Sequence, residues 1–208
     1  DGGYMSHSFK FCILGAHINN AESQLALLQS IEKFKVDNYN YDKRTEQIFT
    51  SNIQHGILAL YSINSALECL MLLLDNELNL GAKKNKFYFF NILDILVKEK
   101  IITNIKALEK CKELRRKRNL ITHWEKNGYV ELKCCGHIQF MMSSPTSQNK
   151  IQELLSILNK ENLYEYNSSF KDVINDILEN SEYHCNSINV FLHDELQMFC
   201  SGQLEVGY

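Results

Sequence analysis

Arg118, Asn119 and His123 lie close together in the chain and are residue types that handle phosphate groups. Arginine holds an anionic oxygen with a planar fork of N–H donors, and histidine exchanges protons near neutral pH. At helical spacing, Arg118 falls on the same stripe as the apolar Leu114 and Ile121, where an unpaired charge is costly. The segment therefore predicts phosphate chemistry, with Arg118 paired internally, facing a pocket or facing a second subunit.

On a regular helix, the side chains of Arg118 and His123 point in different directions. At about 100° per residue, the side chains of Arg118 and His123 project about 140° apart. One regular helix therefore directs them poorly at a single phosphate, unless it unwinds locally after Asn119. A two-fold axis would instead let each of two subunits supply part of a composite site. On this ground we expect a homodimer.

A basic run, Arg115, Arg116 and Lys117, leads directly into this segment. Such a run near a helix C-terminus is often only a solvated face, because the helix dipole favours cations there. Beside an Arg/His pair, the same residues also suit the flanking phosphates of RNA, which would make binding salt-sensitive.

A line of polar side chains runs along an otherwise apolar helix predicted over 44–78. Its members fall within about 100° of one another at helical spacing: Tyr61, Asn64, Ser65, Glu68 and Asp75. Two interpretations are open. The polar groups are satisfied within the core and at solvated ends, or Glu68 pairs with Arg118 and holds it in place.

Hydrophobic periodicity predicts an all-α fold in a single domain over 1–208. The predicted helices cover 19–36, 44–78, 87–100, 104–124, 149–159 and 168–199. Asn20 is the expected cap of the first helix, and Thr103 or Asn104 the expected cap of the fourth. Gly56 marks either a kink or a place of close packing.

The residue pattern changes after the predicted helical core, which covers about 44–125. Alternating residues on both sides of a short turn predict a small β-hairpin over about 129–142. A C-terminal helical extension is expected over about 147–200. One proline in 208 residues leaves long helices unbroken.

Composition indicates which partners and which cellular compartment to expect. A net charge of −3 and a pI near 6.2 argue against a protein that coats nucleic acid non-specifically. Seven cysteines, several of them in apolar helical runs, favour reduced thiols in the cytoplasm. The most apolar segment, 57–74, contains interrupting polar residues, so we expect no membrane span.

Two clusters invite a metal-site interpretation: Cys134, Cys135 and His137, and the pair His184 and Cys185. Neither has the paired ligand spacing of a structural zinc site. The sequence also contains no Gly-rich phosphate loop, nucleophile elbow or His-Glu-x-x-His motif. We therefore expect no metal and no cofactor.

Arg118, Asn119 and His123 together resemble the signature of the HEPN superfamily. That signature is an arginine, four to six residues and then a histidine, often with Asn, Asp or His directly after the arginine. The segment 65–70 resembles the acidic-residue helix of the family, and the basic segment 114–117 leads into the motif as in many members. The resemblance covers about 44–125.

The resemblance implies a helical bundle that dimerises and brings two Arg/His sets to a shared cleft. Many members are metal-independent endoribonucleases in toxin–antitoxin, abortive-infection or CRISPR-linked defence, and others are inactive scaffolds. One toxin branch carries a tyrosine two residues after the histidine, which its antitoxin modifies. Glu125 occupies that position here, so this mode of regulation is not expected.

The expected reaction is attack of a ribose 2′-hydroxyl on the adjacent phosphate of RNA, leaving a cyclic phosphate end. His123 would act as general acid or base, and Arg118 would hold the non-bridging oxygens. Asn119 would hydrogen-bond the phosphate or orient the imidazole, and Glu68 would orient Arg118. Flanking phosphates would contact the basic run, Arg115, Arg116 and Lys117.

Two further functions remain open from the sequence. One is a non-catalytic helical interaction module, in which Arg118 and His123 form a buried polar network at a dimer interface. The other is an RNA-binding regulator that uses the basic run without cleavage. An antitoxin or defence-system protein is a further expected partner.

Overall fold

The computed structural model describes residues 12–29, 43–123, 131–132, 138–139, 153 and 156–183 of the chain. The elements are α1 (Ile13–Leu27), α2 (Lys43–Glu77), α3 (Tyr88–Lys98), α4 (Ile105–Thr122), β1 (Glu131–Leu132), β2 (Ile138–Gln139) and α6 (Lys160–Asn180). The described part of the chain is mostly helical, which confirms the all-α class.

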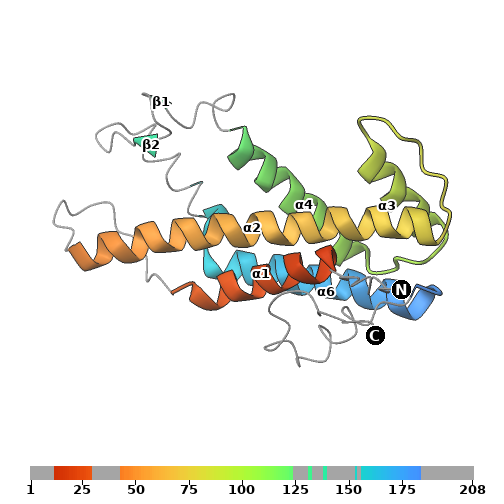
Figure 1. The fold of residues 1–208 in the computed structure, drawn as a ribbon, viewed down its shortest axis with the longest axis horizontal. Coiled ribbons are helices and arrows are strands. Elements are labelled where there is room, and N and C mark those ends of the chain that lie inside the picture. The colour runs from red at the N-terminus through yellow and green to blue at the C-terminus, as the bar shows by residue number, and fades with distance from the viewer. Residues whose placement is uncertain are drawn as a thin grey trace, which may run out of the picture.

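The long helix α2 is the centre of the molecule (Figure 1), with α1 and α6 along one side of it and α4 crossing it on another. Its core-facing residues Leu60, Leu67 and Leu74 are fully buried. The stretch Thr50–Glu77 is long and apolar enough to cross a membrane by composition, but 56% of its most apolar part is buried inside the protein. More than half of this apolar stretch is therefore used in the packing of the core.

The predicted start of the first helix, at Asn19 with Asn20 as cap, is wrong. α1 begins at Ile13, and the Sγ atom of Cys12 accepts a hydrogen bond from the backbone N–H of Gly15 at 3.3 Å. Leu14 and Ile18 extend the buried face upstream of the predicted cap. The Asn20 side chain instead donates to Ser62 Oγ on α2 at 2.5 Å. The predicted end near residue 36 is also wrong, because α1 ends at Leu27 and Leu28 is extended; residues 30–36 lie outside the described residues.

The helix that carries the candidate residues begins where the sequence indicates. Asn104 caps α4, and its Oδ1 accepts from the backbone N–H of Ala107 at 3.0 Å. Asp176 on α6 accepts from the backbone N–H groups of Thr103 and Asn104 at 2.8 and 2.7 Å. The carboxylate thus satisfies donors at a helix N-terminus, which fixes the start of α4 on α6.

The last described helix also begins earlier than predicted. α6 starts at Lys160 rather than near 168, with Asn159 as its cap, because Leu163 and Tyr166 bury the added turns in the core. α6 ends at Asn180, and the predicted continuation from 184 to 199 lies outside the described residues.

Gly56 is a place of close packing, as one interpretation of the sequence had it. A Cβ atom there would lie 3.2 Å from both Cβ and O of Leu158.

β1 and β2 pair antiparallel, with Glu131 opposite Gln139 and Leu132 opposite Ile138. The rest of the expected hairpin range, 129–142, lies outside the described residues.

Candidate functional site

Arg118 lies at the crossing of α4 and α2 and is half-buried. Its guanidinium lies over the ring of Tyr61, 5.5 Å from the ring centroid, and its Nη1 donates to Asn119 Oδ1 at 3.0 Å. Its Nε is buried without a hydrogen-bond partner in the described part of the chain. No carboxylate among the described residues pairs with Arg118, so its charge is held by a ring face and a neutral amide.

His123 is the C-cap of α4, and its side chain is exposed. Its backbone N–H donates to the carbonyl of Asn119 at 3.0 Å. The candidate base therefore lies at the solvent-facing end of the helix, whereas Arg118 packs toward α2. This arrangement matches the divergence of the two side chains expected from helix geometry.

The end of α4 is tied to α2 through two hydroxyl groups. Thr122 Oγ1 donates to the backbone carbonyl of Arg118 at 2.9 Å, and it lies 2.6 Å from Tyr61 Oη. Because the Thr122 hydroxyl already donates to a carbonyl, the Tyr61 hydroxyl is the donor in the second bond. Tyr61 therefore supports both Arg118 and the last turn of the helix.

The predicted pairing of Glu68 with Arg118 is wrong. Glu68 Oε1 instead accepts from Arg115 Nη1, and the Arg115 guanidinium lies 4.2 Å from the ring centroid of Phe89 on α3. α2 and α4 run in opposite directions at the crossing. Tyr61 therefore contacts Arg118, whereas Glu68, two turns further along α2, contacts Arg115, one turn before Arg118 on α4. Arg115 is neutralised and covered, which argues against its expected contact with RNA phosphates.

Asn64 is the residue that sequence reasoning left without a role at the site. It is 0% exposed, and neither its Oδ1 nor its Nδ2 has a hydrogen-bond partner in the described part of the chain. The signal for it was present in the polar line on α2, but that line did not distinguish Asn64 and Tyr61 from Glu68.

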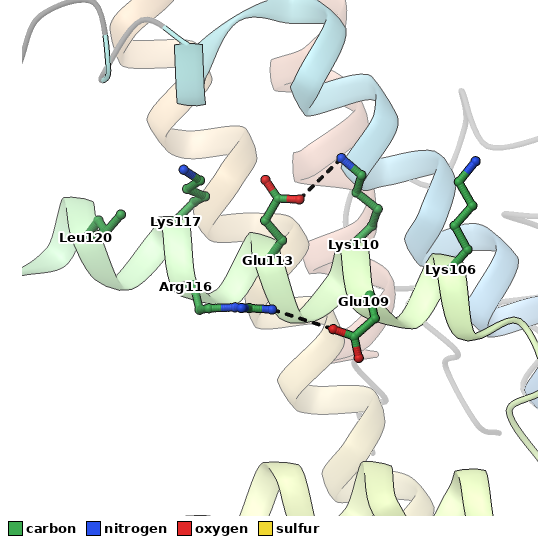
Figure 2. A pocket seen from close by; sticks show the side chains of 7 residues that line it. All are labelled: Lys106, Glu109, Lys110, Glu113, Arg116, Lys117 and Leu120. Atoms are coloured by element: carbon green, nitrogen blue, oxygen red, sulfur yellow. Dashed lines mark ion pairs between the residues drawn. The ribbon is translucent and has the colours of Figure 1, made fainter. Parts of the chain in front are cut away.

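An open groove of about 580 Å³ runs along the outer face of α4. Figure 2 shows its lining side chains, which are Lys106, Glu109, Lys110, Glu113, Arg116, Lys117 and Leu120. Lys110 pairs with Glu113 at 3.3 Å and with Glu165 of α6 at 3.1 Å. Arg116 lies 3.7 Å from Glu109. Among the described residues Lys117 forms no ion pair within 4 Å, although it interacts electrostatically with Glu113. The four cationic side chains of the groove outnumber its two carboxylates, which favours an anion there.

These contacts and burial shift the pKa values of several side chains on α4. The hydrogen bond to Glu165 raises the pKa of Lys110, which keeps it charged. Burial disfavours ionisation of Glu113, but hydrogen bonds from Tyr166 and Lys110 outweigh that effect and lower its pKa. Burial raises the pKa of the Cys111 thiol to about 12, so this cysteine is a packing residue rather than a nucleophile.

The described residues contain no group of three or more His, Cys, Asp or Glu side chains that could hold a metal ion. The two cysteine–histidine clusters weighed in the sequence, 134–137 and 184–185, lie outside the described residues. No family model, curated protein or solved structure matches this chain.

Proposed function

We propose that this chain is a metal-independent endoribonuclease of the HEPN type that cleaves RNA to a 2′,3′-cyclic phosphate end. Its fold would be a HEPN-like helical bundle with a small β-hairpin insertion. This activity fits a toxin or antiviral-defence effector that acts in the cytoplasm. An antitoxin or another defence-system protein would hold it in check.

The observation that carries the proposal is the state of Arg118. Arg118 is half-buried, and no carboxylate in the described part of the chain forms an ion pair with it. Its positive charge is therefore not compensated there and suits the oxygens of a phosphate. His123 lies five residues on at the exposed helix end, where it can exchange protons with bound RNA and with water.

The roles of the site residues follow from these positions. Arg118 holds the non-bridging oxygens as negative charge grows on the phosphorus centre. His123 takes the proton from the 2′-hydroxyl or gives one to the leaving oxygen. Asn119 accepts from Arg118 and keeps the guanidinium near the helix end. Arg116 and Lys117, in the groove on α4, bind the flanking phosphates.

A homodimer would bring Arg118 of one subunit to His123 of the other. The exposed face of α2 offers a surface for such contact, which we call the α2 stripe: Leu58, Ser65, Cys69 and Leu72, all within about 60° on the helix. Leu58 and Leu72 are 47% and 48% exposed. The stripe carries no charge and borders Tyr61, which contacts Arg118.

The test is cleavage of total cellular RNA by the purified chain without divalent metal. Wild type is expected to produce new 2′,3′-cyclic phosphate ends, and His123→Ala to reduce their rate by roughly 10²-fold or more. Because the His123 side chain is exposed, this variant should retain wild-type stability. His17→Ala on α1 is the matched control and should cleave normally. Equal cleavage by His123→Ala and wild type would remove the catalytic role of His123.

A second function is favoured by a different observation. Both Tyr61 and Glu68 use their polar groups within the fold, on Thr122 and Arg115 respectively. Such a network fits a non-catalytic module in which the α2–α4 crossing supports a dimer interface. RNA left intact by wild type, together with dimers that dissociate in Arg118→Ala, would favour this function. RNA binding without new ends would favour an RNA-binding regulator instead.

A further inference from the structure

Three buried polar atoms lack hydrogen-bond partners in the described part of the chain, and all three lie on α2 and α4: Oδ1 and Nδ2 of Asn64, and Nε of Arg118. A buried amide without partners destabilises a fold relative to an apolar side chain of similar shape. Asn64 is fully buried, so its amide has no access to solvent. A buried amide without a partner in the fold therefore needs a functional explanation.

The contacts on either side of Asn64 place it opposite Arg118. Tyr61, one turn before it on α2, lies under the Arg118 guanidinium. Glu68, one turn after it, pairs with Arg115, one turn before Arg118 on α4. The side chains of these three α2 residues project within about 60° of one another. Asn64 thus lies on the face of α2 that is turned to α4, at the level of Arg118.

We propose that Asn64 is a positioning residue for Arg118, whose Nε–H it accepts through Oδ1 when the guanidinium engages a phosphate. This inference rests on the proposed function, in which that phosphate belongs to RNA. In the structure, Nη1 of Arg118 donates to Oδ1 of Asn119. Once a phosphate takes the Nη groups, the guanidinium turns and its buried Nε–H faces Asn64.

The chemical type of Asn64 fits this role better than a carboxylate would. A neutral amide orients the guanidinium without cancelling its charge, so the whole charge remains for the phosphate. Glu68 in the same role would neutralise the cation, as it does for Arg115. The structure thus separates the arginine that stabilises the crossing from the arginine that is kept for an anion.

The first experiment compares stability with cleavage. Asn64→Leu removes the partnerless amide at similar volume, so its melting temperature should equal or exceed that of wild type. Its kcat for RNA cleavage should fall at least about tenfold, with a smaller change in KM, because the guanidinium is no longer oriented in the transition state. Ser62→Ala is the matched control: it removes a buried polar contact of α2 with Asn20 and should leave kcat unchanged.

The second experiment does not depend on cleavage. Exchange of the Arg118 Nε–H proton with solvent is measured by NMR in saturating inorganic phosphate. Exchange should be at least about tenfold slower in wild type than in Asn64→Leu. Equal exchange in both proteins would overturn the proposal, and Asn64 would be a buried amide or water site only. Slow exchange in a wild type that cuts no RNA would reject the nuclease and keep the positioning contact.

Discussion

Arg115 and Arg118 lie one turn apart on α4 and have different surroundings. Arg115 has a carboxylate, Glu68, and the ring of Phe89. Arg118 has a ring, Tyr61, and a neutral amide. Because a guanidinium is always charged in proteins, its environment decides whether that charge is available. Arg115 contributes to the helix crossing, whereas Arg118 has no carboxylate partner among the described residues, which is why we propose it as the ligand of a phosphate.

At the residue scale we predict that Glu68→Gln destabilises the protein by about 1–3 kcal/mol, because Arg115 loses a charged partner in a partly buried pair. RNA cleavage per folded molecule should stay within about twofold of wild type, since Glu68 does not touch Arg118. Urea unfolding and cleavage assays measure the two quantities.

The control for Glu68→Gln is Glu109→Gln, which breaks two surface pairs, with Lys112 and with Arg116, and should cost about 0–1 kcal/mol. A Glu68→Gln protein that keeps its stability but loses cleavage would show that Glu68 acts on Arg118 after all.

The sequence identified the polar residues of this crossing but not their partners. The period of α2 is enough to place Tyr61, Asn64 and Glu68 on one face. Which side chain of α4 each one meets depends on the crossing angle and on the opposite directions of the two helices, which no local pattern encodes. The prediction was off by one helical turn: Glu68 meets Arg115, one turn before the expected partner Arg118.

Helix α4 is joined to α6 by a small ionic network. Lys110 pairs with Glu113 and Glu165, and Tyr166 Oη donates to Glu113 Oε1 at 2.9 Å. The network links α4, which carries Arg118, to α6. The stability of the candidate site therefore depends on the protonation of Glu113.

At the element scale we predict a pH effect from this network. The folded pKa of Glu113 is lowered below its ordinary value of 4.5, so ionised Glu113 stabilises the folded state above about pH 4.5. That contribution is lost as the pH falls through the folded pKa. Glu113→Gln should therefore lose less stability than wild type between pH 6 and pH 3, as measured by urea unfolding at each pH.

Tyr166→Phe tests the same network from α6, because it removes the hydroxyl that donates to Glu113. Its pH dependence should also be smaller than that of wild type. Tyr164→Phe removes a neighbouring hydroxyl that contacts Leu25 O instead, and it should follow wild type. A Glu113→Gln protein with the full wild-type pH dependence would exclude the network as its source.

Element boundaries show where sequence information was sufficient. The bounds of α2 and α4 agree closely with prediction, because a long apolar run and the Asn104 cap are local signals. α1 and α6 begin earlier than predicted, because Cys12 is a rare cap and because burial of Leu163 extends α6 beyond its clearest apolar period. Packing, rather than local propensity, decided those two starts.

At the scale of the whole molecule, the proposed composite site would require two copies of the chain. We predict that Leu72→Glu, which places a charge on the α2 stripe, converts a dimer to a monomer and removes cleavage. Sedimentation velocity measures the first effect. Leu27→Glu changes a similarly exposed leucine on α1 and should affect neither association nor cleavage.

Mixing two inactive variants tests the composite site directly. In a random mixture of Arg118→Ala and His123→Ala subunits, about half of the dimers are mixed, and each mixed dimer contains one intact site. Activity should therefore return to about a quarter of the wild-type value. A mixture that stays inactive although mixed dimers form would place both residues of each site in one subunit.

Helix α4 is held at both ends by other helices: Asp176 of α6 binds its start, and Tyr61 of α2 binds Thr122 in its last turn. Between these anchors the helix has 18 residues. Inserting or deleting one residue would rotate everything beyond it by about 100° and shift it by about 1.5 Å. Proteins that share this site are therefore expected to vary in the sequence of this segment but to keep its length.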